Sequence, residues 1–261
     1  DSNGLNYQGD PDTYTVEYDT DGETLSIVYA DATKGWIPLN DDDVTDAPVA
    51  PPTQKAIFAY GTTGSNVSMS NLVNSSGVIA TDTTGVGTAR SESDAAGYGT
   101  DKAIFAYGST GSAVNMSNLV SNSGVVATDV TGVGTARYAL AAATYGGDKA
   151  IFGYGTTGSN TALTNLVSNS GVVASDVSGV GSARRALAAA GYGGPAVGKA
   201  IFGYGLVSGN VTLTNLVSNV GVVASDVSGV GTARRVLSAA GYGEDKAIFG
   251  YGFVSSASSL T

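Results

Sequence analysis

One phrase recurs along this chain at a nearly fixed interval, and that period limits the possible folds more than any other feature. The phrase Lys-Ala-Ile-Phe-(Ala/Gly)-Tyr-Gly begins at positions 55, 102, 149, 199 and 246, which gives periods of 47, 47, 50 and 47 residues. A period between about 20 and 50 residues indicates one supersecondary unit, copied so that each copy buries its faces against its neighbours. The sequence therefore predicts a tandem array over residues 55–261, whose last copy is incomplete.

Each copy predicts four short strands separated by glycines. In one copy these are Ala188–Tyr192, Lys199–Tyr204, Leu213–Val217 and Gly221–Ser225. The 38 glycines, the abundant Val, Thr, Tyr and Ile, and the lack of a long apolar stripe of helical period all oppose helices. Even the alanine-rich run is short and bounded by glycine, so we expect it to be a strand.

Four strands in about 47 residues is the size of one β-propeller blade, and small residues suit its innermost strand. We therefore expect an all-β fold, a β-propeller-like array of four-stranded repeats preceded by a small N-terminal β segment. Stacked coils of an open solenoid or a trimeric β-helix are the alternative. The first copy lacks a first strand, which Val236–Tyr242 would supply if the ring closed with four blades. The additional strand at Lys246–Gly252 leaves the number of blades open.

The charge is concentrated before the repeats and marks a domain boundary. Residues 1–54 carry 12 acidic residues and only Lys34, whereas residues 55–261 carry 10 acidic and 11 basic residues. Within residues 1–46, alternation over residues 13–30 around Asp21-Gly22 predicts a β-hairpin, and the proline-rich residues 47–54 predict an extended linker. The run Asp19–Glu23 partly resembles a calcium loop, but a hairpin turn explains it more simply.

Composition excludes several classes of function. The chain has no cysteine and no histidine, so it has no thiolate metal site and no ordinary Ser-His-Asp or Cys-His arrangement. The chain has no run of 18 apolar residues, so its sequence predicts no membrane insertion. An acidic segment beside a nearly neutral array argues against nucleic-acid binding, which requires Lys and Arg at the phosphates. The Gly-Val-Gly pieces lack the Gly-Lys-Ser/Thr of a phosphate loop and are better interpreted as bends.

An aspartate and an arginine recur eight residues apart in each copy. They are Asp82 and Arg90, Asp129 and Arg137, Asp176 and Arg184, and Asp226 and Arg234. Because arginine binds carboxylates and stacks on rings, one interpretation is a repeated ligand clamp with the tyrosine eight residues further on. Residues kept in every copy are also what the contact between copies requires. We favour this structural interpretation, in which one arginine per repeat ties neighbouring repeats together.

The copies differ mainly in the loop after each Tyr-Gly and in the segment after each arginine. In a four-stranded blade both emerge on the same face, and variation on one face of a repeated scaffold is how binding surfaces are built. Drift in unconstrained loops is the alternative explanation. The candidate binding residues are Thr62, Thr63, Asn66, Ser109, Thr110, Thr156, Thr157, Asn160, Leu206 and Asn210.

The order of these landmarks resembles Kelch repeats. In that family an arginine precedes an apolar first strand, a second strand ends in glycines, and a later strand carries an aspartate before the next arginine. The corresponding order here is Arg184, Leu187–Tyr192, Lys199–Gly205, Leu213–Val217, Asp226 and Arg234. The family's paired glycine is replaced by Gly-Tyr-Gly, and its tryptophan is missing from every copy. The resemblance covers residues 55–261 and implies a β-propeller.

The near-identity of the copies is similar to tandem blocks in structural proteins of tailed marine phages. The segment Leu25–Pro38 also looks like a short β element found near distal domains of phage fibres. This resemblance implies a virion protein, such as part of a tail fibre, that works in a homo-oligomeric assembly. Its partners would be a host-surface glycan or protein, or neighbouring virion subunits.

We therefore expect a non-enzymatic structural or adhesive module of a virion appendage. A cellular or secreted propeller that binds proteins or glycans is the second hypothesis. The third is a glycoside hydrolase or lyase that uses carboxylates alone, but a catalytic pair should be unique, and most acidic residues of the array are repeated. The exceptions are Glu92, Asp94 and Glu244, and nothing in the sequence pairs them. The sequence thus predicts no catalytic residue, no cofactor and no metal site.

Overall fold

The computed structural model describes residues 26–38, 56–194, 198–243 and 245–254. The expected strand near Tyr14, the turn at Asp21-Gly22, the candidate calcium loop Asp19–Glu23 and the proline-rich linker 47–54 lie outside these residues.

A short hairpin lies in the N-terminal segment. Strand β1 (Ile27–Asp31) pairs antiparallel with β2 (Gly35–Pro38). The Asp31 carboxylate accepts hydrogen bonds from the main-chain N–H groups of Thr33 and Lys34, at 2.8 and 2.7 Å, which closes the turn. Residues 35–38 lie outside the hairpin predicted over residues 13–30, because that prediction rested on alternation around Asp21-Gly22 and did not include this aspartate turn.

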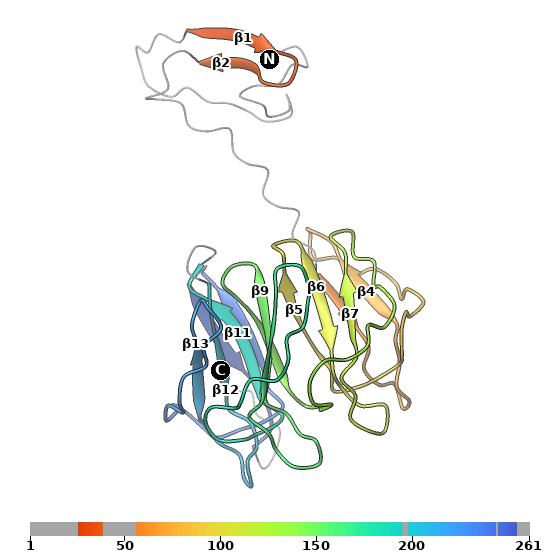
Figure 1. Ribbon diagram of the computed structural model, residues 1–261, viewed down its shortest axis with the longest axis vertical. Coiled ribbons are helices and arrows are strands. Elements are labelled where there is room, and N and C mark those ends of the chain that lie inside the picture. Colours follow the sequence, from red (N-terminus) through yellow and green to blue (C-terminus); the bar gives the residue numbers. More distant parts are fainter. Residues whose placement is uncertain (1–25, 39–55, 195–197, 244, 255–261) are drawn as a thin grey trace. The chain divides into compact units, whose positions relative to one another are not determined.

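The repeats form a series of small antiparallel sheets (Figure 1). Three sheets have three strands each, and one sheet of two strands lies at each end of the series. The strands are β3 (Ala56–Ala59), β4 (Ser70–Val73), β5 (Asp94–Tyr98), β6 (Lys102–Ala106), β7 (Ser117–Val120), β8 (Ala141–Tyr145), β9 (Lys149–Gly153), β10 (Thr164–Val167), β11 (Ala188–Tyr192), β12 (Lys199–Gly203), β13 (Thr214–Val217), β14 (Ser238–Tyr242) and β15 (Lys246–Gly250). The expected all-β class is confirmed.

The expected fourth strand is present as a paired segment with only two isolated bridges. In the third complete sheet, Thr214 bridges Val227 and Val217 bridges Val223, so the later segment has one residue more than strand β13 between the bridges. The extra residue makes a bulge. The Asn215 side chain fills this gap by donating to the Ala224 carbonyl at 2.9 Å, which replaces a regular ladder hydrogen bond.

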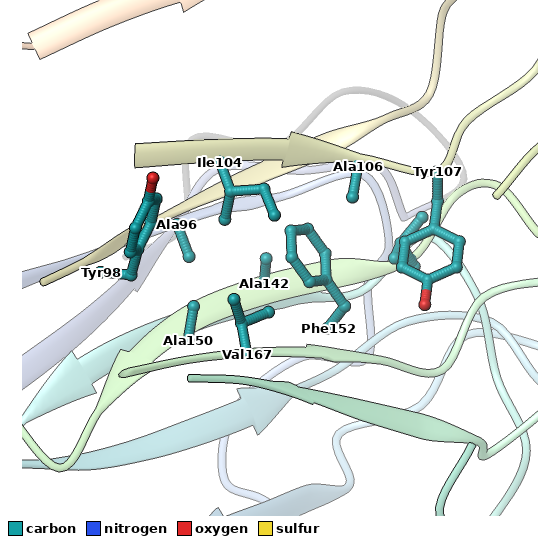
Figure 2. Close-up of a cluster of buried hydrophobic side chains, with 10 residues drawn as sticks. Ala96, Tyr98, Ile104, Ala106, Tyr107, Ala142, Ala150, Phe152 and Val167 are labelled. Atoms are coloured by element: carbon teal, nitrogen blue, oxygen red, sulfur yellow. The ribbon is translucent and has the colours of Figure 1, made fainter. Parts of the chain in front are cut away.

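Successive sheets bury their apolar faces against each other. Figure 2 shows Ile104 and Ala106 from β6 facing Phe152 from β9, with Ala142 and Val167 alongside. Ile104, Phe152 and Val167 are completely buried. The next pair of sheets repeats this packing with Ile151 and Phe202. The core of the array therefore lies between repeats rather than within any one of them.

The first strands of successive sheets approach one another closely, β5 beside β8, β8 beside β11, and β11 beside β14. A Cβ on Gly191 would lie 2.9 Å from the Thr144 carbonyl oxygen, and a Cβ on Gly241 would lie 2.8 Å from that of Gly191. Such an approach permits only small side chains, which explains why the strand is rich in alanine and glycine despite alanine's helix propensity.

The end sheets do not join each other in the way that a four-blade ring requires. Strand β14 pairs with β15 over its full length, with Ser238 opposite Gly250 and Tyr242 opposite Lys246. Among the described residues, strand β3 pairs with β4 and with no other strand. The segment Val236–Tyr242 thus completes its own hairpin rather than the first sheet.

Candidate binding surface

One buried arginine occupies each contact between repeats. Arg137 is completely buried, and its guanidinium donates from Nε to the Tyr154 carbonyl at 2.9 Å and from Nη1 to the Thr135 carbonyl at 3.2 Å. Its Nη2 reaches the Phe152 carbonyl at 3.5 Å. Two of these three acceptors belong to the next repeat. Burial lowers the pKa of Arg137 from its ordinary value, although the side chain stays a cation.

The aspartate that faces each arginine also comes from the next repeat. Arg137 lies 3.9 Å from Asp176, not near the Asp129 that precedes it by eight residues. Asp176 accepts hydrogen bonds from the Thr135 hydroxyl at 2.6 Å and from the Asn165 amide at 2.9 Å. Burial acts to raise the pKa of Asp176, but these hydrogen bonds outweigh it and hold the pKa below its ordinary value.

The first three contacts between successive sheets use the same set of residue types. The other ion pairs join Arg90 to Asp129 at 3.9 Å and Arg184 to Asp226 at 3.7 Å. Thr88 and Ser182 donate to these aspartates as Thr135 does to Asp176. With Arg137 and Asp176, six of the eight predicted structural residues thus meet a predicted partner from the adjacent copy. Asp82 and Arg234, at the two ends of the array, have no such ion pair within the described residues.

The tyrosine of the repeated phrase belongs to this contact, although it was not among the predicted residues. The Arg137 guanidinium lies 4.1 Å from the centre of the Tyr107 ring, rather than on Tyr145 as an eight-residue clamp would require. Tyr107 contacts Phe152 of the next repeat at 5.5 Å between ring centres and donates to the Val133 carbonyl at 3.2 Å. The sequence feature that could have identified it is the glycine that directly follows this tyrosine in every copy of the phrase. The backbone of Tyr107 has a positive φ of 62°, which is rare for a tyrosine.

The loops after each Tyr-Gly are tight turns whose tips are open to solvent. Thr62 bridges Asn66, and Thr156 bridges Asn160 in the same way. A Cβ placed on Gly64, Gly111 or Gly158 would meet nothing within 4 Å. Thr63, Thr110 and Thr157 at these tips are exposed, whereas Thr156 at the base keeps only 2% of its surface.

The candidate asparagines are occupied within the array. Asn66 donates to the Ser109 carbonyl at 2.9 Å, and Asn160 donates to the carbonyls of Leu206 and Val207, each at 3.0 Å. Asn210 donates to the Phe253 carbonyl at 3.0 Å. These side chains tie one loop to the next copy's loop. The residues left free to contact a ligand are therefore the tip residues between each pair of bridging positions.

The structure brings the two variable segments of the repeats together. Ser91 bridges Ser109, Tyr138 bridges Thr156, Arg185 bridges Leu206 and Arg235 bridges Phe253. Arg185 and Arg235 also donate to the side-chain oxygens of Asn160 and Asn210, both at 2.9 Å. The loop tips and these segments form one variable surface, which we call the loop face. Its binding role stays a prediction.

Asp94 is the one acidic side chain of the complete sheets that lies at an unrepeated position. It accepts hydrogen bonds from the main-chain N–H groups of Ala95 and Ala142, at 2.8 and 2.9 Å. Burial raises the pKa of Asp94 to about 6 despite these bonds. The corresponding positions are Ala141, Ala188 and Ser238. Glu92, its nearest acidic neighbour in sequence, is exposed, and the Asp94 carboxylate is bonded to main-chain N–H groups rather than to Glu92, so no acid–base pair is assembled among these described residues.

No group of three or more potential ligands is arranged to hold a metal ion among the described residues. The same residues contain no helix with the length and apolar character needed to cross a membrane.

A scan against protein-family models finds no match to this chain, and a search of curated proteins finds none either.

Proposed function

We propose that this chain is a non-enzymatic structural or adhesive module of a virion appendage, such as a phage tail fibre, and that it binds its partner through the loop face. One observation carries this proposal. The repeated polar side chains are used in contacts between repeats, as Arg137, Asp176 and Asn165 are, which leaves the variable tips as the groups free to recognise something else. A host-surface glycan or protein is the partner that fits these tips best.

The architecture that we propose for the array is a sector of a β-propeller with Kelch-like repeats. The convergence of the first strands favours it, because the innermost strands of neighbouring blades approach most closely near the axis. The close contacts of Gly191 and Gly241 with neighbouring first strands agree with that arrangement. Stacked coils would place corresponding strands at equal spacing throughout and would not require small residues in one strand alone.

The chemistry of the tips suits a polar ligand bound weakly at many sites. The first three tips carry Thr, Ser and Gly, whose hydroxyl and main-chain groups both donate and accept hydrogen bonds. They offer few aromatic anchors, so affinity should come from several copies that engage together. The fourth tip reads Leu206-Val207-Ser208-Gly209 and is the most apolar, which gives the loop face one end of different character.

A loop exchange tests the proposal. Replacing Leu206–Asn210 by the sequence of Thr156–Asn160 keeps the asparagine that ties the loop to the next copy, so the fold should be retained. Binding on a glycan array, or adsorption to candidate host cells, should change. Binding that survives the exchange and follows residues 1–54 instead would contradict the proposal, because the array would then be a spacer.

A further inference from the structure

Two arginines of the loop face lie at positions that carry no charge in the earlier copies. Arg185 and Arg235 each follow the buried arginine of their copy, whereas the corresponding residues in the two earlier copies are Ser91 and Tyr138. Both arginines are partly exposed, and neither makes an ion pair within the described part of the chain. Their charges are therefore not used in the ion pairs that join the repeats.

An asparagine holds one end of each guanidinium in place. Arg185 donates from Nη1 to Asn160 Oδ1, and Arg235 donates from Nη1 to Asn210 Oδ1, both at 2.9 Å. Each asparagine is itself fixed, because its amide donates to main-chain carbonyls of the next loop. Arg235 also lies 4.5 Å from the centre of the Phe253 ring. Both side chains are held by the same contact, one repeat apart, so a ligand that binds them would order little that is not already ordered.

The Nε and Nη2 groups of both arginines remain open to a ligand. Within the described residues, neither group of either side chain donates to a protein acceptor. Neither is among the buried polar atoms that lack a partner, so both groups reach solvent. The neighbouring Arg184, by contrast, uses Nε, Nη1 and Nη2 for acceptors within the array. The Nε and Nη2 edge of a guanidinium presents two parallel N–H groups, whose geometry matches a carboxylate.

The main chain brings the two arginines to neighbouring positions. Val236, which follows Arg235, donates its N–H at 2.8 Å to the carbonyl of Ala186, which follows Arg185. Cations at neighbouring positions repel each other, and among the described residues no carboxylate offsets that repulsion. A bound anion would offset it. A polymer that carries carboxylates at intervals can meet both guanidiniums at once.

We infer that Arg185 and Arg235 make the loop face a binding site for an acidic glycan, one with carboxylate groups on its sugar rings. Each guanidinium binds one carboxylate through Nε and Nη2. The tip at residues 157–159 directly precedes Asn160, so its hydroxyl and main-chain groups lie beside Arg185 for the hydroxyls of the same sugar. This inference rests on the proposed function, since it names the ligand class of the same surface.

Three polymers serve as probes of the full chain. Polygalacturonate carries carboxylates, dextran sulfate carries sulfates, and dextran is neutral. Biolayer interferometry at low ionic strength should show that polygalacturonate binds more tightly than the other two. Its affinity should fall as salt is added, because the contact is between charges that solvent reaches.

Serine variants of the two arginines test the site directly. Arg185→Ser and Arg235→Ser each reproduce the first copy, where Asn66 is present and Ser91 stands at the arginine's position, so the fold should be kept. Each should weaken polygalacturonate binding about tenfold, and the double variant about a hundredfold. Arg185→Lys keeps the charge without the paired N–H groups and should lose most of the same affinity. Lys102→Ser, which removes a cation at the far end of β6 from the loops, is the control and should bind normally.

A gain-of-function variant keeps the inference testable if a serine variant folds poorly. Asn66 donates to the Ser109 carbonyl at 2.9 Å, much as Asn160 donates to the next loop, so the support for an arginine already exists in the first copy. The double variant Ser91→Arg, Glu92→Ala copies the Arg-Ala pair at 185 and 186. It should bind polygalacturonate about threefold more tightly or better, because it adds a third guanidinium.

The outcomes separate this inference from the proposed function. Equal binding of dextran and polygalacturonate, lost on exchange of the Leu206–Asn210 loop but unchanged in the arginine variants, would overturn the inference and leave the proposed function in place. Tighter binding of dextran sulfate that depends on the same arginines would replace the carboxylate by a sulfate and overturn the ligand class. No gain in the Ser91→Arg, Glu92→Ala variant, or no binding of any of the three polymers, would also overturn the inference. Binding that follows residues 1–54 would overturn both.

Discussion

Replacing Arg137 by methionine should destabilise the array more than any surface change, and the structure sets the size of the effect. The guanidinium makes two well-formed hydrogen bonds to carbonyls, at 2.9 and 3.2 Å, and one long contact at 3.5 Å. It also lies 4.1 Å from the Tyr107 ring centre. Hydrogen bonds from charged donors contribute about 1.5–3 kcal/mol each, and a desolvated cation–π contact contributes about 2 kcal/mol.

Opposing terms reduce that sum. Methionine regains part of the packing of the arginine stem, and removing the charge also removes its desolvation cost. The two carbonyls that lose a donor remain buried, which costs about 1–3 kcal/mol each. We expect Arg137→Met to lower the free energy of unfolding by about 3–4 kcal/mol, within the range known for breaking a buried charge contact. For a chain of this size the melting temperature should fall by about 10 °C.

A double-mutant cycle with Asp176→Asn separates the ion pair from the rest. The two charges are 3.9 Å apart, and the Asp176 side chain is 25% exposed. A partly solvated pair at this distance should couple by only about 0.5–1 kcal/mol. The carbonyls and the ring would therefore account for most of the effect of Arg137. A coupling energy as large as the whole loss would refute this reasoning.

The assay must report the array itself. Trp36, the only tryptophan, lies on β2 outside the repeats, so far-UV circular dichroism during urea unfolding is the better probe. Lys102→Met is the control, because it removes an exposed pair with Asp101 at 2.9 Å and should cost less than about 0.5 kcal/mol. Unchanged stability of Arg137→Met combined with lost ligand binding would place this arginine in a binding site instead.

Three further perturbations test other parts of the structure. The raised pKa of Asp94, about 6 against 3.8 when unfolded, means that the folded state binds the proton more tightly, so this residue lowers stability as pH rises from about 4 to 6. Asp94→Ala, which introduces the residue found at Ala141, should remove this loss of unfolding free energy, on the order of 1–3 kcal/mol between about pH 4 and 6. Thermal melts recorded at several pH values measure it, and an unchanged pH dependence would mean that another group titrates. Gly134→Ala would put a Cβ 2.3 Å from Asp176, whereas Gly77 has nearly the same φ, 76° against 77°, with open space around it. Gly134→Ala should therefore cost at least about 1 kcal/mol more than Gly77→Ala in urea unfolding. Val236 is a β-branched residue at φ 52° and is 68% exposed, so Val236→Gly should be neutral or raise stability by up to about 1 kcal/mol, and a large loss in thermal melts would show that its side chain is needed.

Local patterning predicted the strands well because each strand is bounded by glycines. Ala188–Tyr192 is β11 as expected, and Lys199–Gly203 and Thr214–Val217 agree with the expected second and third strands within a residue at each end. The prediction of a regular fourth strand was wrong, because the Asn215 side chain rather than a main-chain N–H donates to the Ala224 carbonyl there. Neither the bulge nor the asparagine's role has a periodic signature in a single copy.

The residues of the contact between repeats were recognisable from the sequence, but their partners were not. In a tandem repeat, each inner arginine has one aspartate eight residues before it and another in the next copy, 39 residues after Arg90 and Arg137 and 42 residues after Arg184. Spacing in the sequence does not show which of the two the arginine faces. The fold selects the later one, because the faces of successive sheets bury the arginine between copies. The same ambiguity hid Tyr107, which precedes its arginine by 30 residues.

The differences between copies are more informative about function than the repeated residues are. Each repeated polar group in an inner contact has a partner of fixed chemistry, so changing it costs stability before it can alter recognition. Residues at the loop tips carry no such cost, as the open space around Gly64 and Gly158 indicates. The tips can therefore change from copy to copy while the contacts between repeats, and with them the fold, are kept.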